Sequence, residues 1–207
     1  MDTIQHYTDL EAALQKLFEQ RASCRRYASM PVPLRAVDMI MRSAQGRRHD
    51  DAGRYTPSAH ALYPLRLYLL SRRVAGLERG LYRVDTESSG GHVKLADAPP
   101  VGALLSASLA DDACLEEAPA IAVVAARTDE ALAHFSGQQA DGLRGARYVD
   151  VEAGAAVQNM SLCAAAQGLG GVLVMGLDEA RTAQVLALPK GDAIVCLYCM
   201  GLPANQS

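Results

Sequence analysis

The sequence predicts an α+β fold, in which helices and strands follow one another without the regular alternation of a doubly wound sheet. The apolar run Ala120–Ala126 has the length and composition of a strand that is buried on both faces. The segment Val149–Gln167 is apolar almost all round, which is typical of a long, buried central helix. No linker or repeat interrupts residues 1–207, so we expect a single domain.

Two helices are expected before the first long strand. Thr8 and Glu11 have the spacing of a capping box, which predicts that the first helix begins there. The apolar residues of this helix share one face and are Leu10, Leu14, Leu17 and Phe18. After prolines at positions 31 and 33, a second helix is expected at Leu34–Gln45. Its inner face is predicted to consist of Val37, Ile40, Met41 and Ala44.

Three short strands are expected next. Leu65–Leu70 alternates between apolar and polar residues, and Gly80–Asp85 and His92–Leu95 follow it. A turn-forming segment, Ser88–Gly91, separates the last two. This spacing is typical of a β meander.

The second half of the chain begins and ends with strands. Residues 128–146 show no clear period, so a mobile loop and a short helix both remain open. The glycines of Gly168–Gly171 follow the long helix and do not complete a G-x-G-x-x-G pattern, because Leu173 occupies its last position. A helix C-cap with a tight turn explains them better. The remaining elements are a strand at Val172–Met175, a helix from its N-cap Asp178 to Leu188, and a strand at Ala193–Met200.

Composition excludes several classes of function. A net charge of −3 is too acidic for a general nucleic-acid binder, and no segment approaches the roughly 18 apolar residues of a membrane span. Cys196 and Cys199 lie three apart on an expected strand and therefore point to opposite faces, which argues against a shared metal or redox pair. The histidines have no metal-ligand spacing, and residues 1–20 are polar without an apolar run, so we expect no signal peptide. We expect a cytoplasmic protein with reduced thiols and no metal, nucleic-acid or membrane partner.

A cluster of hydrogen-bond donors follows the first expected helix. Arg21, Ser23 and Arg25 place two guanidinium groups and a hydroxyl within five residues. A phosphate monoester suits this set, because arginine offers full charge and a fixed fork of N–H groups. A solvated helix end, whose arginines complement the helix dipole, explains the same residues equally well.

A second notable segment is Pro57–Pro64, a turn of small residues bracketed by prolines. The backbone of such a turn can approach a flat ligand closely. His60 lies in this turn and is a candidate proton donor. A structural role is the commoner explanation for a single histidine.

Taken in order, these segments resemble the FMN-dependent nitroreductase family over roughly residues 10–203. Arg21-x-Ser23-x-Arg25 matches the family motif R-x-S-x-R/K, and Pro57-Ser58-Ala59-x-Ala61 matches its small turn. The sequence of Pro57–Leu65, together with Gly80-Leu-Tyr and Arg147-Tyr148, is most similar to the branch that oxidises azolines to thiazoles and oxazoles in modified peptides.

The resemblance implies a nitroreductase-like fold with a mixed central sheet flanked by helices, assembled as an intertwined homodimer. It implies that the arginines hold the FMN phosphate and the serine the ring edge, that the small turn reaches the flavin of the partner subunit, and that backbone N–H groups after the glycine turn face the flavin ring. The residues implied in FMN binding are Arg21, Ser23, Arg25, Pro57, Ser58, Ala59, Ala61, Val174, Met175 and Gly176.

The function implied is an oxidoreductase that takes hydride from NAD(P)H and reduces a small acceptor, such as a nitroaromatic or a quinone, by ping-pong transfer. Two departures from the family are visible. Where azoline dehydrogenases have a Lys-Tyr pair, this chain has His134-Phe135, and no basic residue follows the last expected strand. An azoline-type dehydrogenase and a catalytically silent flavin-binding interaction protein are therefore the alternatives.

Overall fold

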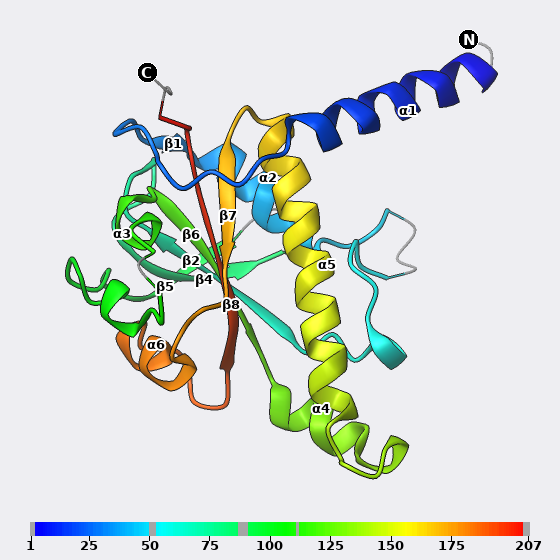
Figure 1. The fold of residues 1–207 in the computed structure, drawn as a ribbon, viewed down its shortest axis with the longest axis vertical. Coiled ribbons are helices and arrows are strands. Elements are labelled where there is room, and N and C mark those ends of the chain that lie inside the picture. Colours follow the sequence, from blue (N-terminus) through cyan, green and yellow to red (C-terminus); the bar gives the residue numbers. More distant parts are fainter. Residues whose placement is uncertain (1–2, 50–52, 87–90, 111, 205–207) are drawn as a thin grey trace.

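The computed structural model describes residues 3–49, 53–86, 91–110 and 112–204. A six-stranded sheet forms the centre of the molecule, with the strand order β5-β4-β2-β6-β8-β7 (Figure 1). The strands are β2 (Leu65–Ser71), β4 (Gly80–Asp85), β5 (Gly91–Ala96), β6 (Ala120–Ala126), β7 (Gly170–Val174) and β8 (Ala193–Gly201). The expected α+β class is confirmed.

Every pairing within this sheet is antiparallel. The neighbours β2, β4 and β5 confirm the expected meander, since short connections can join only antiparallel strands; residues 88–90 of the expected turn lie outside the described residues. Among the described residues, parallel pairing, which a mixed sheet would contain, occurs between the two-residue strands β1 (Val32–Pro33) and β3 (Val74–Ala75) and in a bridge between Ser23 and Gly171.

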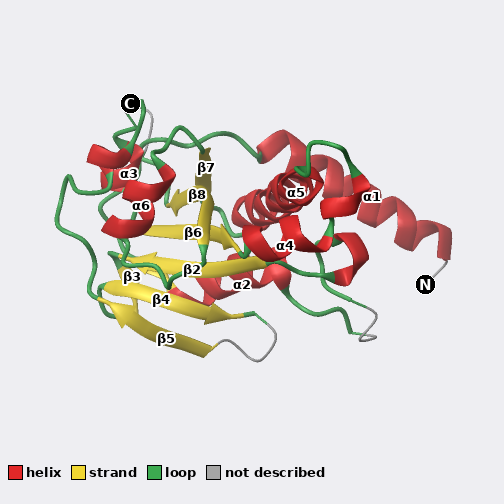
Figure 2. Ribbon diagram, turned by 90° about the horizontal axis from the view of Figure 1, so that it is seen from below, coloured by secondary structure: helices red, strands yellow, loops and turns green. Residues whose placement is uncertain are grey.

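Helices cover both faces of the sheet (Figure 2). On one face lie α2 (Leu34–Gln45), α4 (Thr128–His134) and α5 (Arg144–Ala166), and on the other lie α3 (Cys114–Glu117) and α6 (Glu179–Val185). Short 3₁₀ turns occur at Ala59–Ala61, Leu105–Ala107 and Ser136–Gln138. The carboxylate of Asp178 accepts a hydrogen bond from the N–H of Arg181 at 2.9 Å, which confirms Asp178 as the N-cap of α6.

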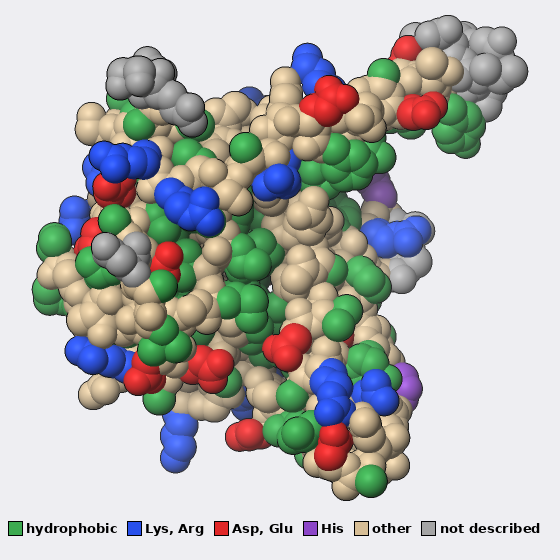
Figure 3. All heavy atoms as spheres, in the orientation of Figure 1, with side chains coloured by type: hydrophobic (Ala, Val, Ile, Leu, Met, Phe, Trp, Pro, Cys, Tyr) green, Lys and Arg blue, Asp and Glu red, His purple; other side chains and the backbone are tan. Residues whose placement is uncertain are grey.

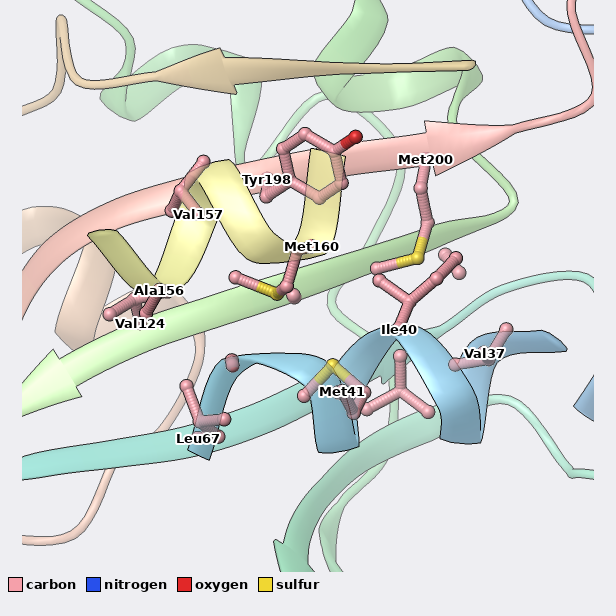
Figure 4. Packing of buried hydrophobic residues seen from close by; sticks show 14 of the residues in the cluster. Val37, Ile40, Met41, Leu67, Val124, Ala156, Val157, Met160, Tyr198 and Met200 are labelled. Atoms are coloured by element: carbon pink, nitrogen blue, oxygen red, sulfur yellow. The ribbon is translucent and has the colours of Figure 1, made fainter. Parts of the chain in front are cut away.

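An apolar core lies on each face of the sheet. Strand β6 contributes alternate residues to both cores and is fully buried, as expected. Cys196 belongs to one core and Cys199 to the other, which confirms that these thiols point to opposite faces. In the larger core, the predicted inner face of α2 packs against α5 and β8 (Figure 4). Burial of these side chains contributes about 1.5–3 kcal/mol each to stability.

The central helix differs from the expectation in two ways. It begins at Arg144, before the predicted start at Val149, and it is buried along one face only. Val151, Gly154 and Gln158 on its other face are exposed. Small residues make both faces of this helix apolar in composition. The sheet can cover only one face, so the other remains exposed. Between β6 and α5 the chain forms α4, so the short-helix alternative for residues 128–146 is correct.

Helix α1 (Thr3–Gln20) projects away from the rest of the molecule (Figure 1). The capping-box prediction is wrong, because Thr8 and Glu11 lie inside this helix. Residues three apart are neighbours on any helix surface, so the same spacing fits a helix interior. Its apolar face is exposed, at 52% for Leu10, 47% for Leu14 and 49% for Phe18. Within the described part of the chain, no helix is long and apolar enough to cross a membrane.

Candidate functional site

The arginine cluster lines a cavity of about 260 Å³. Arg21, Ser23 and Arg25 all face this cavity, and so does Arg26, which the sequence motif does not include. On the side of the molecule shown in Figure 3, basic side chains lie above a strip of hydrophobic side chains beside α5. The remaining walls come from α5, the start of β7, β8 and the chain after β8, through Ser161, Ala165, Leu169, Gly170, Gly171, Tyr198, Pro203 and Ala204.

Backbone hydrogen bonds hold the arginine loop against the sheet. The N–H of Cys24 donates to the carbonyl of Gly171 at 3.0 Å, beside the parallel bridge that joins Ser23 to Gly171. The hydroxyl of Tyr27 donates to the carbonyl of Cys24 at 2.7 Å. Beyond the cavity, the N–H of Ala204 donates to the carbonyl of Arg26 at 3.0 Å. The loop is therefore a fixed edge of the sheet, and its arginines project from a defined backbone.

The glycines between α5 and β7 make this close approach possible. Gly168 has φ +69°, and the N–H of Leu169 donates to the carbonyl of Ala164 at 2.9 Å, so the predicted C-cap is confirmed. A Cβ on Gly170 would lie 2.5 Å from the Cβ of Cys24. A Cβ on Gly171 would lie 2.8 Å from the carbonyl of Cys199 and closer still to the Tyr198 hydroxyl.

Tyr198 forms part of the cavity floor. Its side chain is 1% exposed, and its hydroxyl has no hydrogen-bond partner among the described residues. Burial raises the pKa of Tyr198 to about 12, although Ser161 and the Arg21 guanidinium nearby favour the ionised form. A buried hydroxyl without a partner is costly, by about 1–3 kcal/mol, unless a water or a ligand supplies one.

Among the described residues that line the cavity, only the arginines carry a charge. The cavity lies beside the C-terminal ends of α1 and α5, where the helix dipoles present partial negative charge. An anion at this place gains nothing from the helices. Arg21, Arg25 and Arg26 therefore supply the positive charge that attracts an anion, and arginine is suited to bidentate contacts with phosphate.

The segment Pro57–Tyr63 forms a tight and unusual turn. His60, Ala61 and Tyr63 have φ values of +52°, +53° and +49°, in the left-handed region that residues other than glycine seldom adopt. Each costs roughly 1–2 kcal/mol relative to the right-handed region. Such strain persists only where the surrounding structure imposes it, and it is commoner at functional sites.

Glu152 of α5 imposes this conformation. One carboxylate oxygen, Oε1, accepts hydrogen bonds from the Ser58 hydroxyl at 2.8 Å and from the N–H of Ala59 at 3.0 Å. Ser58 Oγ in turn accepts from the N–H of Tyr63 at 2.8 Å. Two turns further along α5, Asn159 donates to Thr56 Oγ1 at 3.2 Å. Burial raises the pKa of Glu152, against the two hydrogen bonds that lower it.

The sequence offered only a weak signal for these anchors. Glu152 is followed by a run of small apolar residues, and a carboxylate is seldom buried without partners. Its partners lie 93 and 94 residues away, so spacing could not identify them.

The cavity and the turn are not brought together within one chain. The turn is attached to α5 at Glu152, whereas the cavity meets α5 at Ser161. Nine residues of α-helix separate these points by about 14 Å and place them on opposite sides of the helix. Two parts of the predicted site therefore face different regions of space.

The third part, Val174–Gly176, lies at the far end of β7 from the cavity. Val174 is buried, whereas Met175 and Gly176 are exposed. The carbonyl of Gly171 points to the edge of β7 away from β8, since it accepts from Cys24. By the two-residue period of a strand, the peptide group of Leu173 faces the same free edge. Met175 follows the end of β7, and its carbonyl accepts a hydrogen bond from the N–H of Leu177 at 2.8 Å. From Gly171, where the arginine loop meets it, to Val174 this edge spans about 10 Å.

The comparisons with known proteins agree with this geometry. The family model "Nitroreductase family" matches residues 18–202. The chain belongs to the nitroreductase family. A Methanocaldococcus jannaschii protein named "Putative nitroreductase MJ1384" is 31% identical over 178 residues, which is 86% of each chain. The coarser part of the functional prediction, an oxidoreductase of the nitroreductase type, is thereby supported.

Several solved structures share the fold of this chain. A nitroreductase-like chain from Anabaena variabilis has a TM-score of 0.73 and 20% identity; the match covers 95% of this chain and 38% of that one. A chain of the Escherichia coli microcin synthetase McbBCD complex has a TM-score of 0.72 and 21% identity, covering 89% and 70%. The NADPH:FMN oxidoreductase of Vibrio harveyi has a TM-score of 0.64 and 19% identity, covering 93% and 69%.

Proposed function

We propose that this protein is an FMN-dependent oxidoreductase that uses NAD(P)H to reduce a small-molecule acceptor, such as a nitroaromatic or a quinone. The observation that carries the proposal is the cavity with three arginines at the edge of β7. Membership of the nitroreductase family supports the reaction class. A fold neighbour is a NADPH:FMN oxidoreductase, which supports the pair of cofactors.

The residues present fit FMN. Three guanidinium groups suit a terminal phosphate carrying up to two negative charges, and the negative helix ends nearby explain why several are needed. Gly170 and Gly171 leave no side chain between the arginine loop and β7. The unpartnered hydroxyl of Tyr198 on the floor is a donor that a polar ligand or its water can satisfy.

Each residue then has a defined role. Arg21, Arg25 and Arg26 neutralise the phosphate, and Arg26 takes the place of the basic residue missing after β8. The hydroxyl of Ser23 orients the ring edge. Backbone N–H groups just beyond the end of β7, at Met175 and Gly176, stabilise negative charge on the ring, as preorganised donors do. Bound FMN supplies the hydride chemistry between the nicotinamide and the acceptor.

We propose further that the working unit is a homodimer. Because the turn and the cavity face opposite sides of α5, one chain cannot bring both to the same ligand. The exposed face of α5 and the exposed apolar face of α1 both need cover. A second copy that covers them would bring Pro57, Ser58, Ala59 and Ala61 to the flavin of its partner.

A second candidate is oxidation of an azoline or a related substrate in peptide modification. The sequence of Pro57–Leu65 favours this function, whereas His134-Phe135 in place of a Lys-Tyr pair argues against it. A silent flavin-binding interaction protein is the third, and it would bind FMN without turnover.

The test is a two-step spectroscopic experiment on the FMN-loaded protein without oxygen. NAD(P)H should bleach the flavin absorbance, and a quinone or a nitroaromatic should restore it. An azoline peptide is added in parallel to the oxidised protein. Rapid bleaching by the azoline with none by NAD(P)H would favour the second candidate, and no bleaching by either would favour the silent protein.

A further inference from the structure

Two histidines from distant segments meet beside the strained turn. Nδ1 of His60 lies 3.1 Å from Nε2 of His134, at the end of α4. The buried ring of Phe135 packs against both, with ring centroids 5.0 Å from His60 and 4.6 Å from His134. Tyr148 of α5 closes the cluster, 4.7 Å from Phe135. The rings of both histidines are thereby held in place, although both remain exposed to solvent.

The backbone at His60, which presents the ring to this cluster, is strained. Its φ of +52° belongs to the left-handed region, and Glu152 fixes the adjoining residues Ser58 and Ala59. A surface tether between α4 and a loop would not need such a conformation. The geometry instead directs one imidazole outward from a rigid support.

The contact between the two rings determines where a proton can go. A hydrogen bond between two imidazole nitrogens uses one proton, so one ring donates and the other accepts. When His134 Nε2 accepts, His60 carries its proton on Nδ1. Nε2 of His60 then faces away from the pair, and it has no hydrogen-bond partner within the described ranges. A protonated His60 can donate from this nitrogen.

We propose that His60 is the general acid for the acceptor, and that His134 is a positioning residue that sets the tautomer and ring orientation of His60. This proposal rests on the proposed function and names the acceptor class as one that must gain a proton on oxygen. A quinone meets this requirement, because its reduction to a hydroquinone takes up two electrons and two protons. Bound FMN would supply both electrons together with one proton, as hydride, and the His60 imidazolium would give the other proton to the quinone oxygen. Water then reprotonates His60.

Amide substitutions separate this role from a structural one. Asn at position 60 places a polar atom near the position of Nδ1, and it tolerates the left-handed backbone. Gln at position 134 places a polar atom near the position of Nε2. His60→Asn and His134→Gln therefore keep the tether, and only His60→Asn removes the acid. His134→Ala removes the tether, and His49→Asn serves as a control at an exposed histidine outside the cluster.

The reoxidation of the reduced, FMN-loaded protein by a quinone is measured by stopped flow, with FMN affinity measured separately for each variant. We expect His60→Asn to slow reoxidation by about 10²–10⁴ while FMN affinity and bleaching by NAD(P)H stay unchanged. His134→Ala should slow reoxidation less than His60→Asn does. His134→Gln should reoxidise faster than His134→Ala and close to the wild-type rate, and His49→Asn should have no effect on the rate. Added imidazole should partly rescue a His60→Gly variant.

Full-rate reoxidation in His60→Asn would overturn the proposal and leave the pair as a tether, while wild-type bleaching by NAD(P)H would keep the proposed function intact. A failure of the wild type to bind FMN would overturn the proposed function itself. If His60 serves the partner's flavin, a mixture of Arg21→Ala/Arg25→Ala chains with His60→Asn chains should recover activity. One of the two sites in a mixed dimer then has intact arginines and an intact His60. No recovery would contradict the placement of His60 at the flavin of the partner.

Discussion

The carboxylate of Glu152 accepts a hydrogen bond from the Ser58 hydroxyl at 2.8 Å and ties a strained turn to the middle of α5. The other oxygen, Oε2, is buried and has no hydrogen-bond partner among the described residues. Glu152 thus holds the turn through one oxygen, while its other oxygen is buried without a hydrogen bond. This relationship decides where His60 and Ala59 point, and it leads to the first prediction.

Glu152→Ala should destabilise the protein by about 1–3 kcal/mol, because the Ser58 hydroxyl and the Ala59 N–H lose their acceptor. Glu152→Gln keeps an acceptor oxygen and should lose much less. Urea unfolding at neutral pH measures both variants. Equal stability of the wild type and Glu152→Ala would show that the turn holds its conformation without the carboxylate.

The same carboxylate predicts a dependence of stability on pH. Burial raises the pKa of Glu152 above its ordinary value of 4.5, so the folded state binds this proton more tightly than the unfolded state. The contribution is fully present below the ordinary pKa and is lost as pH rises through the raised one. Glu152→Gln should therefore flatten the fall in unfolding free energy over the weakly acidic range. An unchanged slope would contradict this assignment.

Gly171→Ala should destabilise the protein by about 1–3 kcal/mol, since its Cβ would press on the Cys199 carbonyl and the Tyr198 hydroxyl. The same change should distort the cavity and weaken FMN binding. Gly137→Ala is a matched control, because no atom lies within 4 Å of its added Cβ. Thermal unfolding of the two variants provides the measurement, and similar melting temperatures would count against the close approach at Gly171.

Leu14→Glu should weaken self-association. Leu14 lies on the exposed apolar face of α1, which we propose a second copy covers. A dimer of this kind is expected to bury more than about 2,000 Å². Light scattering over a range of protein concentrations tests the change, with Lys16→Glu as a control at an exposed position of the same helix. A wild-type monomer that binds one FMN per chain would refute the shared site.

Local features of the fold were predictable from the sequence. The inner face of α2, the C-cap at Gly168 and the N-cap at Asp178 each depend on residues within a few positions of one another. The start of α1 was not, because Thr8 and Glu11 have a spacing that both a helix terminus and a helix interior allow. A local sequence pattern identifies a helix terminus only when it does not fit a helix interior as well.

The motifs of the site were predictable from the sequence, whereas the contacts between residues far apart in the chain were not. Arg21, Ser23 and Arg25 could be selected because they lie within five residues, and the structure places them around one cavity. The contact between His60 and His134 spans 74 residues of sequence, and Tyr198 reaches the cavity only because Gly171 leaves room for its hydroxyl. Contacts of this kind depend on strand order and helix packing, which no short motif encodes.

The central claim is that the arginine cavity holds the phosphate of FMN. Its most direct test compares FMN with riboflavin, which has the same ring and lacks the phosphate, by fluorescence titration of the flavin-free protein. The account predicts that Arg21→Ala and Arg25→Ala each weaken FMN binding by about ten-fold or more, the effect of losing a charge-assisted hydrogen bond. Riboflavin affinity should stay unchanged in both variants. FMN affinities equal to that of the wild type, or an equal loss for both flavins, would contradict the phosphate assignment.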